Sequence, residues 1–136
     1  MKIILDTNIW ISFLLGKRLS LLRQIIENPN IQIYISPQLL EEIIIVSQRP
    51  KFKNKISAES VSYLFDLINN SCRLVNTDSK VGVIVRDLKD IFLLSMAQDI
   101  PADYLITGDK DLLVIEEYKE CHIVQFSDFL KILSIF

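Results

Sequence analysis

The sequence predicts an α/β fold of three layers, α/β/α, in which a parallel sheet is covered by helices on both faces. Two observations lead to this class. Short apolar runs rich in β-branched residues recur along the 136 residues, and they alternate with segments in which apolar residues recur every three or four positions. Strands that are almost continuously apolar are typical of parallel sheets buried on both faces. A chain of this length fits one domain, so we expect residues 1–136 to form a single unit.

The strands are predicted from the apolar runs in chain order. The first, KIILD at residues 2–6, ends in Asp6. For residues 73–76 and 81–85 two alternatives are open, one interrupted strand or a strand followed by a loop. The remaining predicted strands are residues 31–35, 103–107 and 122–126.

Amphipathic helices are predicted between the strands. Pro37 is expected to begin one of them, Ser57 to cap the next, and Ser127 to begin the last. Their apolar stripes recur at helical spacing. In chain order the stripes are Leu22, Ile25 and Ile26; Leu39, Ile43 and Val46; Val61, Leu64, Phe65 and Ile68; Leu93, Leu94 and Ala97; and Phe129, Leu130 and Leu133.

Composition excludes several classes of protein. Half of the residues are hydrophobic, with only 3 glycines and 4 prolines, which argues against disorder. The apolar run at residues 9–15 is too short to span a bilayer and lacks the flanks of a signal peptide, so we expect no membrane association and a cytoplasmic location. Cys72 and Cys121 form no C-x-x-C motif and are expected to be reduced packing residues. The single histidine, His122, is expected to be structural, which argues against a zinc site.

The candidates for a common site are five acidic residues: Asp6, Glu42, Asp90, Asp109 and Asp111. Asp6 ends the first predicted strand, and Asp109 follows the strand at 103–107. Because the carboxyl ends of parallel strands meet at one edge of the sheet, these two carboxylates are expected to be neighbours. Helical spacing places Glu42 and Asp90 on the core-facing sides of their helices, although Glu41 is placed almost as well as Glu42.

Each acid also has a simpler interpretation, since Asp6, Asp90 and Asp109 are all in position to cap a helix. Capping does not require that they meet at one edge, and their predicted convergence favours a joint site. Carboxylates gathered in this way repel one another unless cations neutralise them. Oxygen ligands without histidine or cysteine favour Mg²⁺ or Mn²⁺, and such a site supports phosphoryl transfer with water as the nucleophile. No G-x-S-x-G turn and no glycine-rich phosphate loop is present.

The charge distribution agrees with a phosphodiester substrate. The formal charge of −2 becomes +3 once Asp6, Glu42, Asp90, Asp109 and Asp111 are set aside, which leaves a mildly basic surface around an acidic centre.

The segment RPKFKNK, residues 49–55, has two interpretations. It is either a solvated loop between two helices or an arm that contacts phosphates through Arg49, Lys51 and Lys53. Spaced cations around one aromatic residue, Phe52, suit single-stranded nucleic acid.

Nearly the whole chain, from Met1 to about Leu130, resembles the PIN-domain family, and in particular its VapC-related toxins of prokaryotic toxin–antitoxin pairs. The segments that carry the resemblance are ILDTNIWIS, SPQLLEEI, RDLKDIFLLSMA, DYLITGDKDLL and HIVQFSDFL. The resemblance implies a sheet in the order 3-2-1-4-5 and a Mg²⁺- or Mn²⁺-dependent endoribonuclease. It also implies a homodimer and a cognate antitoxin protein that silences the enzyme.

The resemblance assigns roles to individual positions. Asp6, Glu42, Asp90 and Asp109 match the four acidic site positions of the family, and Asp111 matches an additional acid near the metal. Thr7, Asn8 and Thr107 match the polar residues that orient these acids. Gly108 is expected to permit a tight exit from the preceding strand.

Two departures from the family pattern keep other functions open. Ile91 stands where relatives often carry a further aspartate, and Leu88 replaces a frequent proline. A module that binds RNA or protein without cutting it is therefore the first alternative. A phosphatase with an aspartate nucleophile is the second, but that chemistry needs an acid at position 8, where this chain has Asn8.

Overall fold

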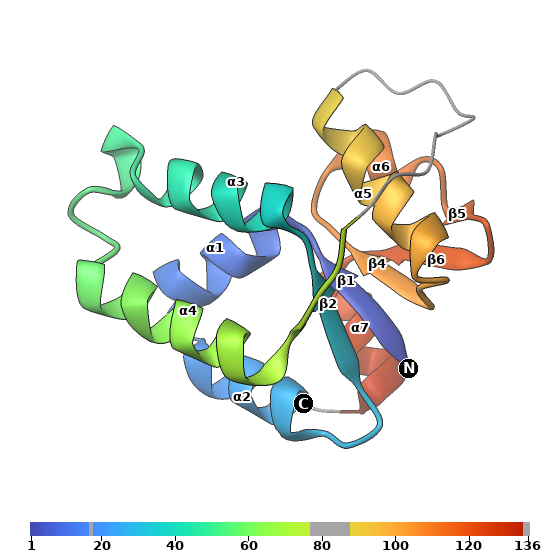
Figure 1. The fold of residues 1–136 in the computed structure, drawn as a ribbon, viewed down its shortest axis with the longest axis horizontal. Coiled ribbons are helices and arrows are strands. Elements are labelled where there is room, and N and C mark those ends of the chain that lie inside the picture. Colours follow the sequence, from blue (N-terminus) through green and yellow to red (C-terminus); the bar gives the residue numbers. More distant parts are fainter. Residues whose placement is uncertain (17, 77–87, 135–136) are drawn as a thin grey trace.

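The structure, a computed structural model, describes residues 1–16, 18–76 and 88–134, and of residues 88–90 it describes only the helical backbone. Its centre is a six-stranded sheet in the order β3-β2-β1-β4-β6-β5 (Figure 1). The strands are β1 Lys2–Leu5, β2 Gln32–Ile35, β3 Arg73–Leu74, β4 Tyr104–Ile106, β5 Glu117–Tyr118 and β6 Cys121–Val124.

Five of the strands are parallel and stand in the predicted order. β1 pairs with β2 on one side and β4 on the other, β2 pairs with β3, and β4 pairs with β6. The predicted fold class and the order 3-2-1-4-5 are therefore confirmed for these strands. The possible strand at residues 81–85 lies outside the described residues.

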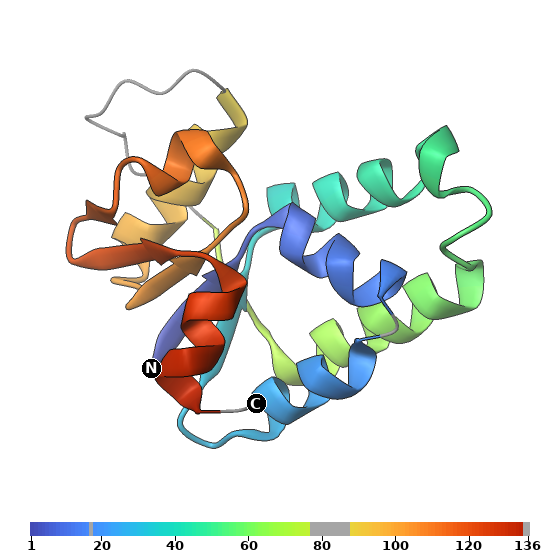
Figure 2. The same ribbon diagram turned by 180° about the vertical axis from the view of Figure 1, so that it is seen from behind.

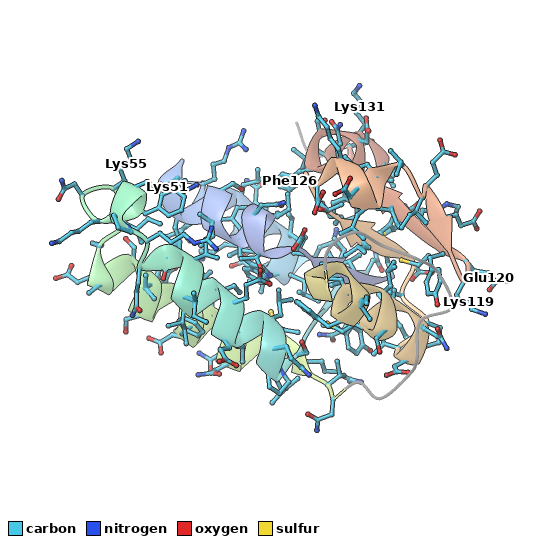
Figure 3. All side chains as sticks on the ribbon, turned by 90° about the horizontal axis from the view of Figure 1, so that it is seen from above. Lys51, Lys55, Lys119, Glu120, Phe126 and Lys131 are labelled. Atoms are coloured by element: carbon cyan, nitrogen blue, oxygen red, sulfur yellow. The ribbon has the colours of Figure 1, made fainter. Side chains whose placement is uncertain are left out.

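The strand that sequence patterns missed is β5, which pairs antiparallel with β6 at the sheet edge. It has only two residues, Glu117 and Tyr118, and so shows no apolar run. The turn residues Lys119 and Glu120 both have positive φ, 51° and 69°, as a two-residue hairpin requires. Neither is the glycine or asparagine that normally marks such a turn. Figure 3 shows both side chains at this end of the molecule.

The predicted helices are confirmed, with small shifts of their ends. Ser36 caps α3 by accepting a hydrogen bond from Leu39 N–H (3.2 Å), and Ser57 caps α4 by accepting one from Ser60 N–H (3.1 Å). Asp90 is not at the N-cap position of its helix, because α5 begins two residues earlier, at Leu88. The helices are α1 Thr7–Leu15, α2 Leu19–Glu27, α3 Pro37–Ser47, α4 Ala58–Ser71, α5 Leu88–Asp99, α6 Lys110–Leu113 and α7 Phe126–Leu133, with a short 3-10 helix, η1, at Pro50–Phe52.

Helices cover both faces of the sheet. Viewed from opposite sides, α5 lies over β1 and β4 on one face and α7 lies on the other, while α1–α4 pack together as one group (Figures 1 and 2). Ile3, Ile4 and Leu5 of β1 are completely buried. No helix among the described residues is both long and apolar enough to cross a membrane.

The two cysteines are unpaired thiols, as predicted, with Cys72 half-buried and Cys121 buried. Burial raises the pKa of each thiol to about 12, so neither is activated as a nucleophile.

Register places the ends of β1 and β4 together. Leu5 is paired with Ile106, and the N–H of the next residue, Asp6, donates to Ile106 O (2.9 Å). The two strands therefore deliver Asp6 and Thr107 to the same point at the carboxyl edge of the sheet, although they are 101 positions apart in the sequence.

Candidate active site

Asp6 lies at the centre of the site, in the turn between β1 and α1. Its Oδ1 accepts a hydrogen bond from Thr7 N–H (2.6 Å), which caps α1. Its Oδ2 accepts from the Thr107 hydroxyl (2.7 Å) and more weakly from the Asn8 side-chain amide (3.5 Å). Only 7% of Asp6 is exposed, so its carboxyl group is held in a defined orientation away from bulk water.

The electrostatic environment of Asp6 opposes its ionisation. Burial raises the pKa of its carboxyl group from 3.8 to about 6. The hydrogen bonds from Thr107 and Thr7 favour the ionised form and limit this rise, whereas the negative charges of Glu42 and Asp109 add to it. The hydrogen-bond donors that Asp6 has within the described part of the chain are all neutral. A nearby cation would therefore stabilise the ionised form.

Glu42 reaches the site from the middle of α3. The Thr7 hydroxyl donates to Glu42 Oε2 (3.0 Å), which links α1 to α3 directly beside Asp6. Glu42 lines the same pocket as Asp6, and Glu41 does not. The structure thus separates two positions that helical spacing alone left almost equivalent.

Asp109 enters the site after β4. Its side chain caps α6 by accepting from Asp111 N–H (2.9 Å), and its own N–H donates to the Thr107 hydroxyl oxygen (3.0 Å). Thr107 is fully buried, and its hydroxyl group contacts both the Asp6 side chain and the Asp109 backbone. Asp111 is half-buried and does not line the pocket that Asp6 and Asp109 share.

The expected role of Gly108 is wrong. Its φ does not lie in the left-handed region, and an added Cβ would meet Asn8 Nδ2 at 3.7 Å, an ordinary van der Waals distance. Its N–H donates to Asn8 Oδ1 (3.3 Å), an interaction that any residue with a backbone N–H can make. The exit from β4 therefore does not require glycine.

A pocket of about 380 Å³ opens at these acids. Arg49, Lys51 and Phe52, from the segment between α3 and α4, line it together with Asp6, Glu42 and Asp109. The other lining residues are Thr7, Asn8, Ile11, Ser12, Leu15, Val46 and Leu93. An acidic centre and a cationic rim thus belong to one cavity.

The third predicted RNA contact, Lys53, is in a different place. It lines two other surface pockets and not the acidic one. Figure 3 shows Lys51 and Lys55 at the end of the molecule where α3 and α4 are joined. The residues of the basic segment therefore line different pockets, and only some of them border the acids.

Asp90 lies in the first turn of α5, and its side chain is outside what the structure describes. Three residues later, Leu93 is buried and lines the acidic pocket, so this end of α5 reaches the site. Among the side chains that are described, no three histidine, cysteine, aspartate or glutamate residues are grouped closely enough to hold a metal ion. The side chain of Asp90 is not among them. His122 is exposed near the start of β6, and its ring lies 5.8 Å from that of Tyr104 at the start of β4. It is therefore at the amino ends of the strands, away from the acids at their carboxyl ends.

Comparison with known proteins identifies the family. A sequence model of the PIN domain matches residues 2–111. The chain belongs to the PIN domain family. Comparison of this PIN domain with curated protein sequences gave no match.

Two solved structures resemble this PIN domain in fold. One is a chain of VapBC2 from Rickettsia felis, bound to a DNA fragment from their promoter, with 20% identity and a TM-score of 0.60 over 92% of this chain and 98% of that chain. The other is the PIN domain of human SMG5, with 15% identity and a TM-score of 0.53 over 98% of this chain and 99% of that chain. At these identities the likeness extends to the fold and no further.

Several residues that line the pocket of this PIN domain were not predicted from the sequence to do so. Ile11, Leu15, Val46 and Leu93 are apolar residues on helices, and their pattern does not distinguish a pocket wall from the core. Phe52 could be noticed in the sequence, because it is the one aromatic residue among the spaced cations of residues 49–55.

Proposed function

We propose that the protein is a metal-dependent endoribonuclease that cleaves single-stranded RNA by means of metal-activated water. The observation that carries this proposal is the convergence of Asp6, Glu42 and Asp109 on one pocket. Burial and the charges of Glu42 and Asp109 raise the pKa of Asp6 to about 6, as expected where carboxylates gather without a cation. These acids share a pocket with Arg49 and Lys51. Cations on the rim attract the phosphodiester, and carboxylates in the centre suit a divalent ion.

The donor set fits Mg²⁺ or Mn²⁺. The acids that line the pocket offer hard oxygen ligands, and no histidine or cysteine lines it. Asp6 and Asp109 would hold the ion, with Asp90 as a third ligand and Asp111 acting through water. When bound, the ion lowers the pKa of a coordinated water and stabilises negative charge on the phosphate.

The chain itself keeps these acids in position. Thr107 contacts Asp6 through its hydroxyl and Asp109 through the same oxygen, and Thr7 binds Glu42. Asn8 bridges Asp6 and the backbone of Gly108. These hydrogen bonds fix the separation of like charges before any cation binds, which preorganises the site.

Cleavage of a fluorescently labelled single-stranded RNA tests the proposal. We expect cleavage with Mg²⁺ or Mn²⁺, none with EDTA, and a loss of at least about 100-fold in Asp6→Asn and Asp109→Asn. Asp66→Asn, which makes the same chemical change on an exposed part of α4, is the matched control and should remain active. Full activity in both site variants would remove the proposal.

We further propose that the enzyme is the toxin of a toxin–antitoxin pair and acts in the cytoplasm as a homodimer. The fold shared with a chain of the Rickettsia felis VapBC2 structure supports this role. Expression should arrest growth, and co-expression of a small protein encoded beside it should restore growth. Light scattering should give twice the mass of 15.7 kDa.

A binding module without nuclease activity is the competing function, and Ile91 directly after Asp90 is the feature that favours it. Titration calorimetry with Mn²⁺ separates the two. The nuclease requires Mn²⁺ binding that Asp6→Asn and Asp109→Asn abolish. RNA binding without such Mn²⁺ binding identifies the module.

A further inference from the structure

Part of the acidic pocket is not needed for phosphoryl transfer. Phe52 lines it next to Arg49 and Lys51, and Leu15 and Val46 add apolar surface from α1 and α3. Carboxylates and a metal ion act on the phosphate, for which an apolar and aromatic wall has no use. This wall is therefore available for another part of the substrate.

The backbone of Phe52 is held firmly. Its N–H donates to Arg49 O (2.9 Å), and its carbonyl accepts from both Lys55 N–H and Ile56 N–H (2.9 Å each). The side chain is half-buried, packed on the core from one side while it borders the pocket. A fixed aromatic ring at a cavity wall loses little conformational entropy when a ligand binds to it.

A cation accompanies the ring. Lys51 Nζ lies 4.9 Å from the centre of the Phe52 ring, within cation–π range, and Arg49 lines the same pocket. An aromatic surface with two cations suits a ligand that has a planar apolar face and an anionic group close to it. An unpaired nucleotide has both, in its base and its phosphate.

The size of the pocket limits what it can hold. A volume of about 380 Å³ lies near the lower end of the range of roughly 300–1,000 Å³ found for small-molecule sites. This is space for about one nucleotide and not for a paired duplex. The cavity therefore favours a base that has left the stack.

We propose that Phe52, Lys51 and Arg49 form a subsite for one unpaired nucleotide of single-stranded RNA, whose base stacks on Phe52 and whose phosphate binds the two cations. The choice of RNA as the substrate rests on the proposed function. The subsite lies in the same cavity as Asp6, so it binds the nucleotide adjacent to the cleaved bond. Lys53, which lines other pockets, is not part of it.

Binding of a fluorescein-labelled single-stranded RNA, followed by anisotropy in EDTA, tests the subsite without cleavage. All variants are made in the Asp6→Asn protein, here called the parent, in which the negative charge of the pocket is lower. Phe52→Leu keeps apolar volume and removes stacking, so we expect binding to weaken about 5- to 100-fold. Phe52→Trp should bind within about 3-fold of the parent, and Lys53→Ala should change affinity less than about 2-fold.

Salt dependence separates stacking from charge. Phe52→Leu should leave the slope of log affinity against log salt unchanged, whereas Lys51→Ala should reduce it by about 0.7, the value for one phosphate contact on a single strand. If Phe52→Leu does not fold, RNAs with one abasic position are used with the parent protein. One abasic position should then weaken binding by a similar factor.

The outcomes distinguish this inference from the proposed function. Cleavage by the chain with an intact Asp6, combined with equal RNA affinity in Phe52→Leu and the parent, overturns the subsite and leaves the nuclease. RNA binding that depends on Phe52, without cleavage under any metal condition, supports the subsite and overturns the nuclease. If the parent binds no single-stranded RNA, or if every abasic RNA binds as well as the intact one, the subsite is overturned.

Discussion

The substitution Asp6→Asn should change how the stability of the protein depends on pH. Asp6 is buried, and the pKa of its carboxyl group rises from 3.8 to about 6 mainly because burial disfavours the charged form. Asparagine has almost the same shape and no charge at any pH. The difference in unfolding free energy between the two proteins therefore isolates the ionisation of this one carboxyl group.

The sign and size follow from proton linkage. Below pH 3.8 Asp6 is protonated in both the folded and the unfolded state, so its ionisation has no effect on stability. As pH rises from there to about 6, the unfolded chain loses this proton first, and the folded state becomes less stable relative to it. Above pH 6 the full cost is present. The difference between a pKa of 3.8 and one of about 6 corresponds to about 3 kcal/mol.

Urea denaturation in EDTA at pH 4 and at pH 8 measures this effect. The unfolding free energy of Asp6→Asn minus that of the wild type should be higher at pH 8 than at pH 4 by up to about 3 kcal/mol. Changed hydrogen bonds to Thr7 and Thr107 affect both pH values alike and cancel. A difference that is the same at both pH values would show that Asp6 ionises without hindrance, and the electrostatic argument for a cation at this site would fail.

Three further substitutions test other parts of the structure. Thr107→Val removes the hydroxyl that favours the ionised form of Asp6, so NMR titration of the Asp6 carboxyl carbon should give a pKa above about 6; an unchanged or lower value would contradict the 2.7 Å hydrogen bond. Gly108→Ala should change the thermal unfolding free energy by less than about 1 kcal/mol, and a larger loss would mean that the turn does need glycine. Leu94→Ala in α5 removes a completely buried side chain and should cost about 2–5 kcal/mol in urea denaturation, whereas a negligible cost would contradict its burial.

The elements that could be predicted from the sequence are those whose burial leaves a continuous pattern. β1 is buried from Ile3 to Leu5, with sheet partners on both sides, so its apolar run predicts a strand even without information from the neighbouring strands. The two-residue strand β5 is the counterexample. It exists because the Lys119–Glu120 turn folds Glu117 and Tyr118 back onto β6, and pairing with β6 leaves no periodic signal in so short a segment.

The only part of the site that could be predicted with the fold is the part that lies at the ends of strands. Asp6 and Asp109 follow β1 and β4, so their meeting is a consequence of topology. Whether Glu41 or Glu42 faces the site depends on the direction in which α3 leaves β2. The sequence does not contain that direction, whereas the hydrogen bond from Thr7 to Glu42 in the structure shows it. The division of Lys51 from Lys53 likewise depends on η1, a single 3-10 turn with no sequence periodicity of its own.

Capping and site formation are not competing roles for the aspartates. Asp6 Oδ1 caps α1 and Asp109 Oδ1 caps α6, so in each case one carboxylate oxygen is used by the fold. In Asp6 the other oxygen, Oδ2, accepts from both Thr107 and Asn8. The capping oxygen Oδ1 accepts from Thr7 N–H, and a carboxylate oxygen has a second lone pair beyond the one that a single donor occupies. The cap fixes the orientation of the carboxyl group, and α1 adds its positive N-terminal dipole to offset part of the charge. An asparagine cap would hold the helix equally well but would not supply the negative charge. An aspartate at this buried position therefore supplies what the proposed cation needs and what the cap alone does not.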